Sequence, residues 1–564
     1  MPVTTRETTC LHCSLCCPAG VAIDDVGLVS PEYPGHEPGS HHGLCARGHF
    51  IAELLAHPGR LREAMERGGE EPRAISTDPR GRAVLLRGSR EGLAVVIDGN
   101  LPCEEIARAA HVTRMGLNVD RVAIFIPTAD EAVLRGLATS GVERVPKEAL
   151  AECDIILAVG DPFATHPLVA SPILDAIAKA RGNRLLCIDS VAGSTAGFAA
   201  EFCQVAPGGE AAALAGLLAV MGAAGDLPAR CDLAAAAEMA GVEPAALESL
   251  ARAIGGARRL GVAIALPEGR CMAAAAAAAL AAKVAEAKGG CICPLLTYGN
   301  AVGAWRMAAA LDAMTTSELM HDVRAGHINR LIVVGTDIVS AIPMPELSAV
   351  EVLAAAAAMP SATTARAQLV LPMAFWFELS GTVADGSGAL RTLAAAAEPA
   401  RGALAPSEAL ARLCADVEPM ADADIRAMAA ADPPMDLARV LGAPGDWAPP
   451  ARQEGAMLVV SRADCLGFAD GSASRQLLWP AMMEPQPKVR LNPADGPGGG
   501  ETFGWTAGAV TLRGEGMSLT LPAEVSADVP QGVAAVSPNF PETRMLFAWA
   551  ATGVGPGHAT IEEG

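Results

Sequence analysis

The feature that most constrains this chain is a group of cysteines near its amino terminus. Three of them follow one another closely and a fourth stands alone, so that Cys10, Cys13, Cys17 and Cys45 have the spacing C-x2-C-x3-C-x27-C. Three thiolates on one short loop and a distant fourth can occupy the corners of a [4Fe-4S] cluster, and thiolates prefer iron–sulfur or zinc to hard cations. The sequence therefore predicts one [4Fe-4S] cluster bound by these four cysteines.

Three alternatives stay open from the spacing alone. A structural zinc site normally uses two close pairs of ligands, whereas Cys45 has no second cysteine beside it. Cys16 competes with Cys17 for the third position, because C-x2-C-x2-C is also a cluster spacing. Histidines of the following stretch, such as His41 and His42, are further candidates for iron ligation.

The segment around these cysteines is expected to be irregular. Between Cys17 and Cys45 the chain is rich in Gly, Pro and His, which predicts a loop rather than packed elements. A helix-like stretch follows over residues 51–56 and stops at Pro58 and Gly59.

Length and composition limit the class of protein. A chain of 564 residues, 51% hydrophobic, predicts several well-packed globular domains. Its formal charge of −21 argues against nucleic acid as a partner, since phosphates are neutralised by Lys and Arg. The longest uncharged, alanine-rich run, residues 272–282, is too short to cross a bilayer, so no direct membrane span is predicted. Fifteen scattered cysteines are too dilute for a disulfide-stapled secreted protein, and no signal peptide opens the sequence, which predicts a cytoplasmic location.

The central part of the chain predicts an α/β fold. Short, continuous aliphatic runs, rich in β-branched residues, alternate with helical stretches, as expected for parallel strands covered on both faces. The runs are residues 93–97, 122–126, 155–159, 185–188 and 331–334, and the helical stretches are 103–115, 168–180 and 211–220.

The last part of the chain has a different pattern. Residues 403–447 are helical and then rich in proline, which predicts a linker. Beyond it, short β-rich runs at 489–495, 509–512 and 519–521, separated by Gly and Pro, predict a small barrel-like domain.

Several stretches, in order, carry a family likeness. The chain resembles the molybdopterin oxidoreductase superfamily, which includes formate dehydrogenases, nitrate reductases and the large iron–sulfur subunit of NADH-quinone oxidoreductase (complex I). The matching stretches are Gly-Leu-Cys-Ala-Arg-Gly at 43–48, the "GsNP…HP"-like segment at 152–167, the "PGtD"-like turn at 207–210, a glycine turn at 299–304, and an "LP…E…GT…GR" pattern formed by Leu371, Pro372, Glu378, Gly381, Thr382, Gly388 and Arg391. In this family the cluster motif is C-x2-C-x3-C-x~27-C, so the resemblance selects Cys17 over Cys16.

The resemblance also implies a domain organisation. It implies an N-terminal [4Fe-4S] loop domain, two doubly wound α/β domains and a C-terminal β-barrel-like domain. The expected boundaries are 1–60 for the cluster domain, 61–127 plus about 300–450 for the first α/β domain, 128–300 for the second, and 455–564 for the barrel.

Departures from the family pattern bear on function. Catalytic members bind molybdenum or tungsten through Cys, selenocysteine or Ser, but residues 118–152 contain no cysteine, and Ser140, their only serine, lies late in the stretch. Cys103 precedes the stretch and is expected to be packed in a helix. The family's lysine two residues after the fourth cysteine is Arg47 here, which keeps the positive charge near the cluster.

These departures make the chain most similar to the C-terminal part of the large iron–sulfur subunit of complex I, with the molybdenum ligand lost. The resemblance then implies an iron–sulfur electron-transfer protein that works with other iron–sulfur or flavin subunits and has no catalytic residue of its own. The alternative is a catalytic molybdenum or tungsten subunit similar to the formate dehydrogenase alpha subunit. It would hold molybdopterin guanine dinucleotide against the turns at Gly160, Asp189, Pro207–Gly208 and Gly335.

Overall fold

The chain folds into two compact units. The computed structural model describes residues 4–25, 27, 29–35, 41–67, 72–74, 90–227, 232–342, 344–414, 417–418, 420, 422–451, 453–462, 464–468, 471–496, 506–514, 517–548 and 557–563. Unit 1 comprises Met1–Pro127, Thr297–Pro433 and Leu466–Met483, and unit 2 comprises Thr128–Leu296, Pro434–Cys465 and Glu484–Gly564. Within the described residues, no helix is both long enough and apolar enough to cross a membrane.

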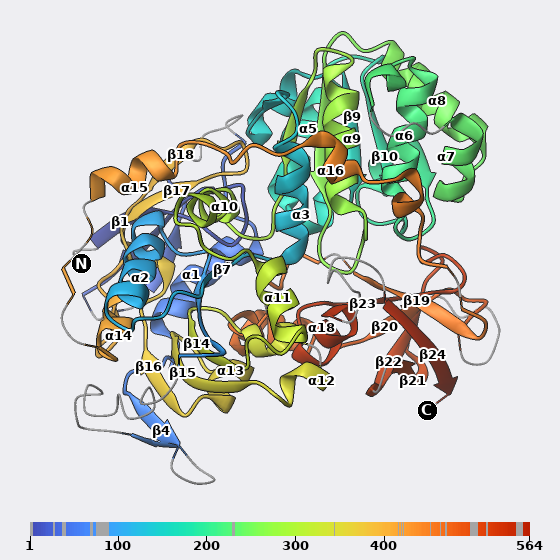
Figure 1. The fold of residues 1–564 in the computed structure, drawn as a ribbon. Coiled ribbons are helices and arrows are strands. Elements are labelled where there is room, and N and C mark those ends of the chain that lie inside the picture. Colours follow the sequence, from blue (N-terminus) through green and yellow to red (C-terminus); the bar gives the residue numbers. More distant parts are fainter. Residues whose placement is uncertain are drawn as a thin grey trace. The chain divides into compact units, whose positions relative to one another are not determined.

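A seven-stranded sheet forms the centre of unit 1, in the order β5-β4-β16-β15-β14-β6-β7 (Figure 1). Its strands are β4 (Met65–Arg67), β5 (Pro72–Ala74), β6 (Leu93–Asp98), β7 (Val122–Phe125), β14 (Arg330–Val334), β15 (Glu351–Ala357) and β16 (Leu369–Pro372). The strands from β16 to β7 are parallel. The chain continues from β6 to β7 on one side and from β14 to β15 and β16 on the other. The strand order therefore reverses between β6 and β14, which is where ligands bind in sheets of this kind.

Helices and a small hairpin complete unit 1. The helices are α1 (Ala46–Ala56), α2 (Cys103–Met115), α10 (Ala301–Ala310), α11 (Thr316–Arg324), α12 (Met344–Leu347), α13 (Ala362–Arg366), α14 (Pro406–Ala411), α15 (Asp422–Met428) and α17 (Leu478–Met483). The hairpin pairs β17 (Gly381–Ala384) with β18 (Leu390–Leu393).

A six-stranded parallel sheet forms the α/β part of unit 2, in the order β11-β10-β9-β12-β13-β8. Its strands are β8 (Glu143–Arg144), β9 (Ile155–Gly160), β10 (Arg184–Asp189), β11 (Glu201–Gln204), β12 (Leu260–Ala265) and β13 (Cys291–Pro294). The helices of unit 2 are α3 (Thr128–Leu137), α4 (Pro162–Thr165), α5 (Ala170–Ala178), α6 (Glu210–Val220), α7 (Leu233–Ala240), α8 (Pro244–Gly255), α9 (Ala274–Glu286), α16 (Leu437–Leu441) and α18 (Pro541–Ala548). All residues of β9 and β12 are buried, as expected of strands covered on both faces. The strand order reverses between these two strands.

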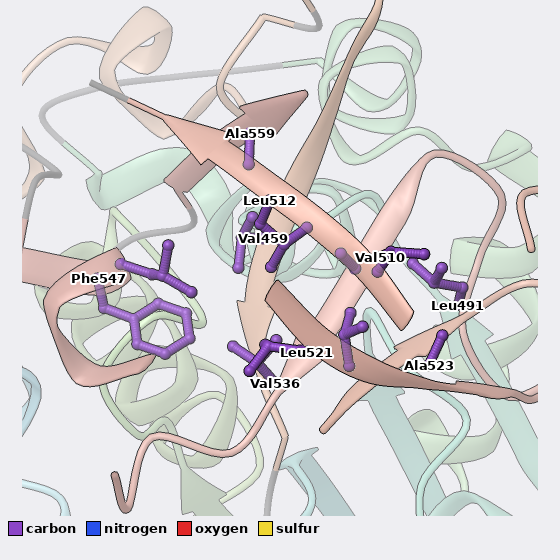
Figure 2. Close-up of a cluster of buried hydrophobic side chains, with 12 residues drawn as sticks. Val459, Leu491, Val510, Leu512, Leu521, Ala523, Val536, Phe547 and Ala559 are labelled. Atoms are coloured by element: carbon purple, nitrogen blue, oxygen red, sulfur yellow. The ribbon is translucent and has the colours of Figure 1, made fainter. Parts of the chain in front are cut away.

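The last strands of unit 2 close into a barrel, in the order β19-β23-β20-β22-β21-β24. They are β19 (Ala456–Ser461), β20 (Val489–Leu491), β21 (Thr506–Gly514), β22 (Met517–Val525), β23 (Val533–Val536) and β24 (Gly557–Glu563). Figure 2 shows aliphatic side chains of these strands, such as Val459, Leu512 and Val536, together with Phe547 of α18 in one buried cluster. The barrel predicted from the short β-rich runs is confirmed.

A small antiparallel sheet near the amino terminus corrects one expectation. Its strands are β1 (Thr4–Thr9), β2 (Pro18–Ile23) and β3 (Val29–Glu32), in that order. The stretch after Cys17 was expected to be a loop, but β2 and β3 lie within it. Pro31 is compatible with β3 because β3 is an edge strand, where a missing N–H costs no ladder hydrogen bond.

The expected linker at 403–447 does contain the passage from unit 1 to unit 2, at Pro433 and Pro434, but it also contains packed elements. Trp447 is 1% exposed, and its indole N–H donates a 2.7 Å hydrogen bond to the carbonyl oxygen of Leu441 at the end of α16. Proline here begins short helical turns instead of marking an open connection.

Candidate functional site

The cysteine loop connects two paired strands. Thr9 of β1 pairs with Pro18 of β2, so Cys10–Cys17 form the connection between them. The Cys10 N–H donates to the Cys17 carbonyl oxygen at 2.9 Å and closes the loop. Cys45 lies at the first turn of α1, as its N-cap.

The four predicted ligands lie near one another. Burial raises the pKa of the Cys10 thiol well above its usual value, and the nearby thiols of Cys17, Cys45 and Cys13 raise it further, in that order of size. Among the described residues, no group of three or more His, Cys, Asp or Glu is arranged so that it could hold a metal ion. The assignment of the four cysteines as cluster ligands stays a prediction.

Cys16 lies near this group. Burial raises the pKa of its thiol, followed by the charge of Asp385 and then the thiols of Cys13 and Cys17. Its φ is +47°, in the left-handed region, and its thiol donates a 3.2 Å hydrogen bond to the Gly299 carbonyl oxygen. This hydrogen bond favours Cys17 as the third ligand.

The loop is fixed by residues far away in the sequence. Asn100 lies just beyond the end of β6, and its side-chain N–H donates to the Leu11 carbonyl oxygen at 3.0 Å. Gly299 lies so close that a Cβ there would be 2.5 Å from the Cα of Leu11, so only glycine fits. The glycine turn noted in the sequence therefore supports the cysteine loop.

Arg47 and His12 lie beside the loop. His12 is 3% exposed, and burial, followed by the positive charge of Arg47, lowers its pKa to about 3. Arg47 is itself 4% exposed, so its charge acts in a poorly solvated region. Arg47 therefore lies beside His12 of the cysteine loop, and its role near a cluster stays a prediction.

A cavity of about 90 Å³ opens where the strand order of unit 1 reverses. Asp98, the last residue of β6, and Asn100 line it, and Gly335–Asp337 line it just after β14. His12 of the cysteine loop lines it too, next to an aromatic wall. The His12 ring centroid lies 4.0 Å from that of Phe468 and 5.4 Å from that of Trp376.

Some polar atoms of this cavity have no partner in the described residues. These atoms are both ring nitrogens of His12 and the hydroxyl of Thr336. Asp337, in contrast, is held in place, because its Oδ1 accepts hydrogen bonds from the Thr363 N–H and hydroxyl at 2.7 and 2.6 Å. Buried polar groups normally have partners, so a ligand with donors and acceptors fits this cavity.

A buried ion pair holds the aromatic wall. Arg60 donates two hydrogen bonds to Glu378, at 2.9 and 2.6 Å, and both side chains are essentially unexposed. Glu378 also accepts from the Phe375 N–H at 2.8 Å, and the Arg60 guanidinium lies 4.8 Å from the Phe375 ring centroid. Glu378 belongs to a motif noted in the sequence, but this role was not predicted. The run Phe375-Trp376-Phe377, in a chain with 3% aromatic residues, was an available signal.

Unit 2 has a buried charged group at its own point of strand reversal. Arg270, after β12, donates to both carboxylate oxygens of Asp189 at the end of β10, at 2.6 and 2.7 Å. Arg270 also donates to the Ser461 carbonyl oxygen at the end of β19, at 2.7 Å, so the pair joins the sheet to the barrel. Glu210, in the "PGtD"-like turn at the start of α6, is fully buried nearby. Two of the predicted turns thus contribute to one polar cluster.

Glu210 gives this cluster a testable pH dependence. Burial, followed by the charge of Asp189, raises its pKa from 4.5 to about 7. The folded state therefore holds the proton more tightly than the unfolded chain, so stability is full below about pH 4.5 and falls by roughly 3 kcal/mol as the pH rises to about 7. We expect Glu210→Gln to remove most of this fall in urea unfolding measured across that range. The exposed Glu238→Gln is the control, and an unchanged pH dependence in Glu210→Gln would contradict the assignment.

The segment in which a metal ligand is expected is very short. β7 ends at Phe125 and α3 begins at Thr128, which leaves two residues between them. The Ser140 hydroxyl lies beyond α3 and bonds to Glu286. Cys103 is fully buried at the start of α2, where burial raises its pKa to about 12 and its thiol faces the Asn300 side chain. Neither side chain therefore has the place of a metal ligand.

Comparisons with known proteins support the fold. No protein-family model matches the chain, and no curated protein sequence matches it. Among solved structures, acetylene hydratase from Pelobacter acetylenicus is similar with a TM-score of 0.71 and 12% identity, over 99% of each chain. The chain thus shares the fold of this neighbour along its whole length.

Proposed function

We propose that this chain is a catalytic protein of the molybdopterin oxidoreductase type, which carries one [4Fe-4S] cluster and a pterin cofactor with molybdenum or tungsten. The observation that supports it best is the similarity to an enzyme, acetylene hydratase, over 99% of both chains. The neighbour's substrate is not carried over at 12% identity.

The cavity of unit 1 would receive only part of such a cofactor, since its volume is about 90 Å³. Asn100, Thr336 and Asp337 would hold polar groups of the cofactor, since they line the cavity at the reversal of the strand order. When bound, the cofactor would supply a metal centre for redox or Lewis-acid chemistry.

The cluster would pass single electrons to and from this centre. Cys10, Cys13, Cys17 and Cys45 would bind it, and buried Arg47 would offset the negative charge of the thiolates and of the reduced cluster. We place the protein in the cytoplasm, free or bound to the membrane through partners, because fifteen cysteines in 564 residues are too dilute for a disulfide-stapled secreted protein.

A second function is favoured by the connection between β7 and α3. Because Ile126 and Pro127 alone join them and neither can bind metal, the chain could instead serve only in electron transfer, as the large iron–sulfur subunit of NADH-quinone oxidoreductase does. Its partners would then be other iron–sulfur or flavin subunits, and it would have no catalytic residues.

Metal and pterin analysis separates the two functions. For protein purified without air, the catalytic function predicts about four irons, about one molybdenum or tungsten and extractable pterin per chain. Iron without molybdenum, tungsten or pterin would exclude it in favour of electron transfer. Protein without iron would contradict both.

A further inference from the structure

Helix α17 presents an unusual apolar surface. Leu478, Trp479, Met482 and Met483 are 60, 59, 63 and 65% exposed, and we call these four side chains the α17 face. Leu477, just before the helix, is fully buried and Pro480 within it is also buried, so the segment is anchored on its other side. Single exposed apolar residues are common, but four large ones on six consecutive residues indicate an interaction site.

The helix is attached to the element that begins at a cluster cysteine. The Leu478 N–H donates to Glu53 Oε1 of α1 at 2.8 Å, and the Gln476 carbonyl oxygen lies 3.0 Å from Nε2 of His57, just after α1. At about 1.5 Å per residue, Glu53 lies about 12 Å along α1 from Cys45. The α17 face is therefore fixed at short range from the cysteines.

The same segment also contacts the cysteine loop. Phe468, earlier in the stretch that leads to α17, packs its ring against His12, which lies between Cys10 and Cys13. A protein bound at the α17 face would be near both parts of the chain that supply cluster ligands.

We propose that the α17 face docks an electron-carrying protein, which exchanges single electrons with the cluster. Trp and Met are enriched in the energetic centres of protein interfaces, and Met adapts to irregular surfaces. The formal charge of −21 disfavours association with an acidic protein, so we expect a partner of net positive charge with an apolar docking surface. Its centre, an iron–sulfur cluster or a flavin, loses one electron as the [4Fe-4S] cluster gains one, or the reverse, and no bond forms or breaks.

A lipid surface fits the α17 face less well. Membrane-bound amphipathic helices carry Lys and Arg on their polar side, whereas α17 has the sequence Leu-Trp-Pro-Ala-Met-Met with no charge. Anionic lipids would also repel this acidic protein.

The proposal rests on the [4Fe-4S] cluster of the proposed function. It is tested by crosslinking and by a paired variant, in which two side chains of the α17 face are replaced together. A photo-crosslinking amino acid replaces Met483 in the full chain, expressed in its native host. We expect a crosslink to one protein that copurifies in equal amount. We expect that protein to contain an iron–sulfur or flavin centre. Trp479→Ser/Met482→Ser should weaken that association and the rate of electron transfer to the cluster by at least about tenfold. Met115→Ser, 68% exposed at the end of α2, is the matched control and should change neither.

Several results would overturn the proposal. They are a crosslink only to a second copy of this chain, binding of the protein to vesicles of anionic phospholipid that the paired variant abolishes, or unchanged association in the paired variant. Iron content is measured on every sample. Iron retained with no crosslink contradicts the docking alone, whereas a crosslinked protein without iron contradicts the proposed function.

Discussion

The Cys17→Ala variant is expected to lose its iron, while Cys16→Ala keeps about four irons per chain. The two cysteines are adjacent and both are buried, so the variants differ little in what they remove from the core. The Cys16 thiol is hydrogen-bonded to the Gly299 carbonyl oxygen. The Cys17 thiol, in contrast, raises the pKa of Cys10 more than any other thiol does. Elemental analysis and electron paramagnetic resonance of the reduced protein would measure the difference.

Each outcome of this comparison has a definite meaning. Loss of iron in Cys16→Ala with iron retained in Cys17→Ala would assign the third ligand to Cys16. Iron retained in both variants would show that this loop does not hold the cluster. Circular dichroism would check that both variants stay folded.

Arg60→Met is expected to destabilise unit 1 by about 3–5 kcal/mol, because it leaves the Glu378 carboxylate buried without its charged partner. In thermal unfolding this corresponds to a fall in Tm of about 10 °C. The variant should also loosen the aromatic wall of the cavity, since Glu378 positions the Phe375 backbone. The matched control is Arg6→Met, whose ion pair with Glu398 at 3.3 Å is exposed and should contribute little.

A double variant sharpens this prediction. Arg60→Met/Glu378→Met removes both charges, which by itself is often nearly neutral. Here recovery should be incomplete, because the N–H groups of Phe375 and Ala400 lose the acceptor to which they donate at 2.8 and 3.0 Å. Equal Tm values for Arg60→Met and Arg6→Met would show that the buried pair does not stabilise the unit.

The strands of the two sheets could be predicted because burial on both faces produces continuous aliphatic runs. Runs such as 93–97 and 155–159 were correctly assigned for this reason, as β6 and β9. Helix α2 was predicted with its observed bounds, since polar and apolar residues alternate with a helical period. β2 and β3 were missed because Gly and Pro there resemble loop signals, although Pro18 is only the first residue of β2 and β3 is an edge strand.

The candidate site was only partly visible in the sequence. The cysteines are predicted from their spacing and Arg47 from its position two residues after Cys45, and both assignments stay predictions. The pair of Arg60 and Glu378 joins residues 318 positions apart, and no spacing rule connects them. The cavity depends in the same way on tertiary contacts between segments distant along the chain.

The inserted sheet has a consequence for how the chain is made. β6 of unit 1 pairs with β14, and the first α/β part of unit 2, Thr128–Leu296, lies between them in sequence. On the ribosome the sheet of unit 1 therefore cannot close until that insert has emerged, whereas the insert already contains all six of its own strands. Contacts distant in sequence form slowly because a long unstructured loop must close. Folding of the insert would shorten that loop. We therefore expect the insert to fold first and the sheet of unit 1 to close afterwards.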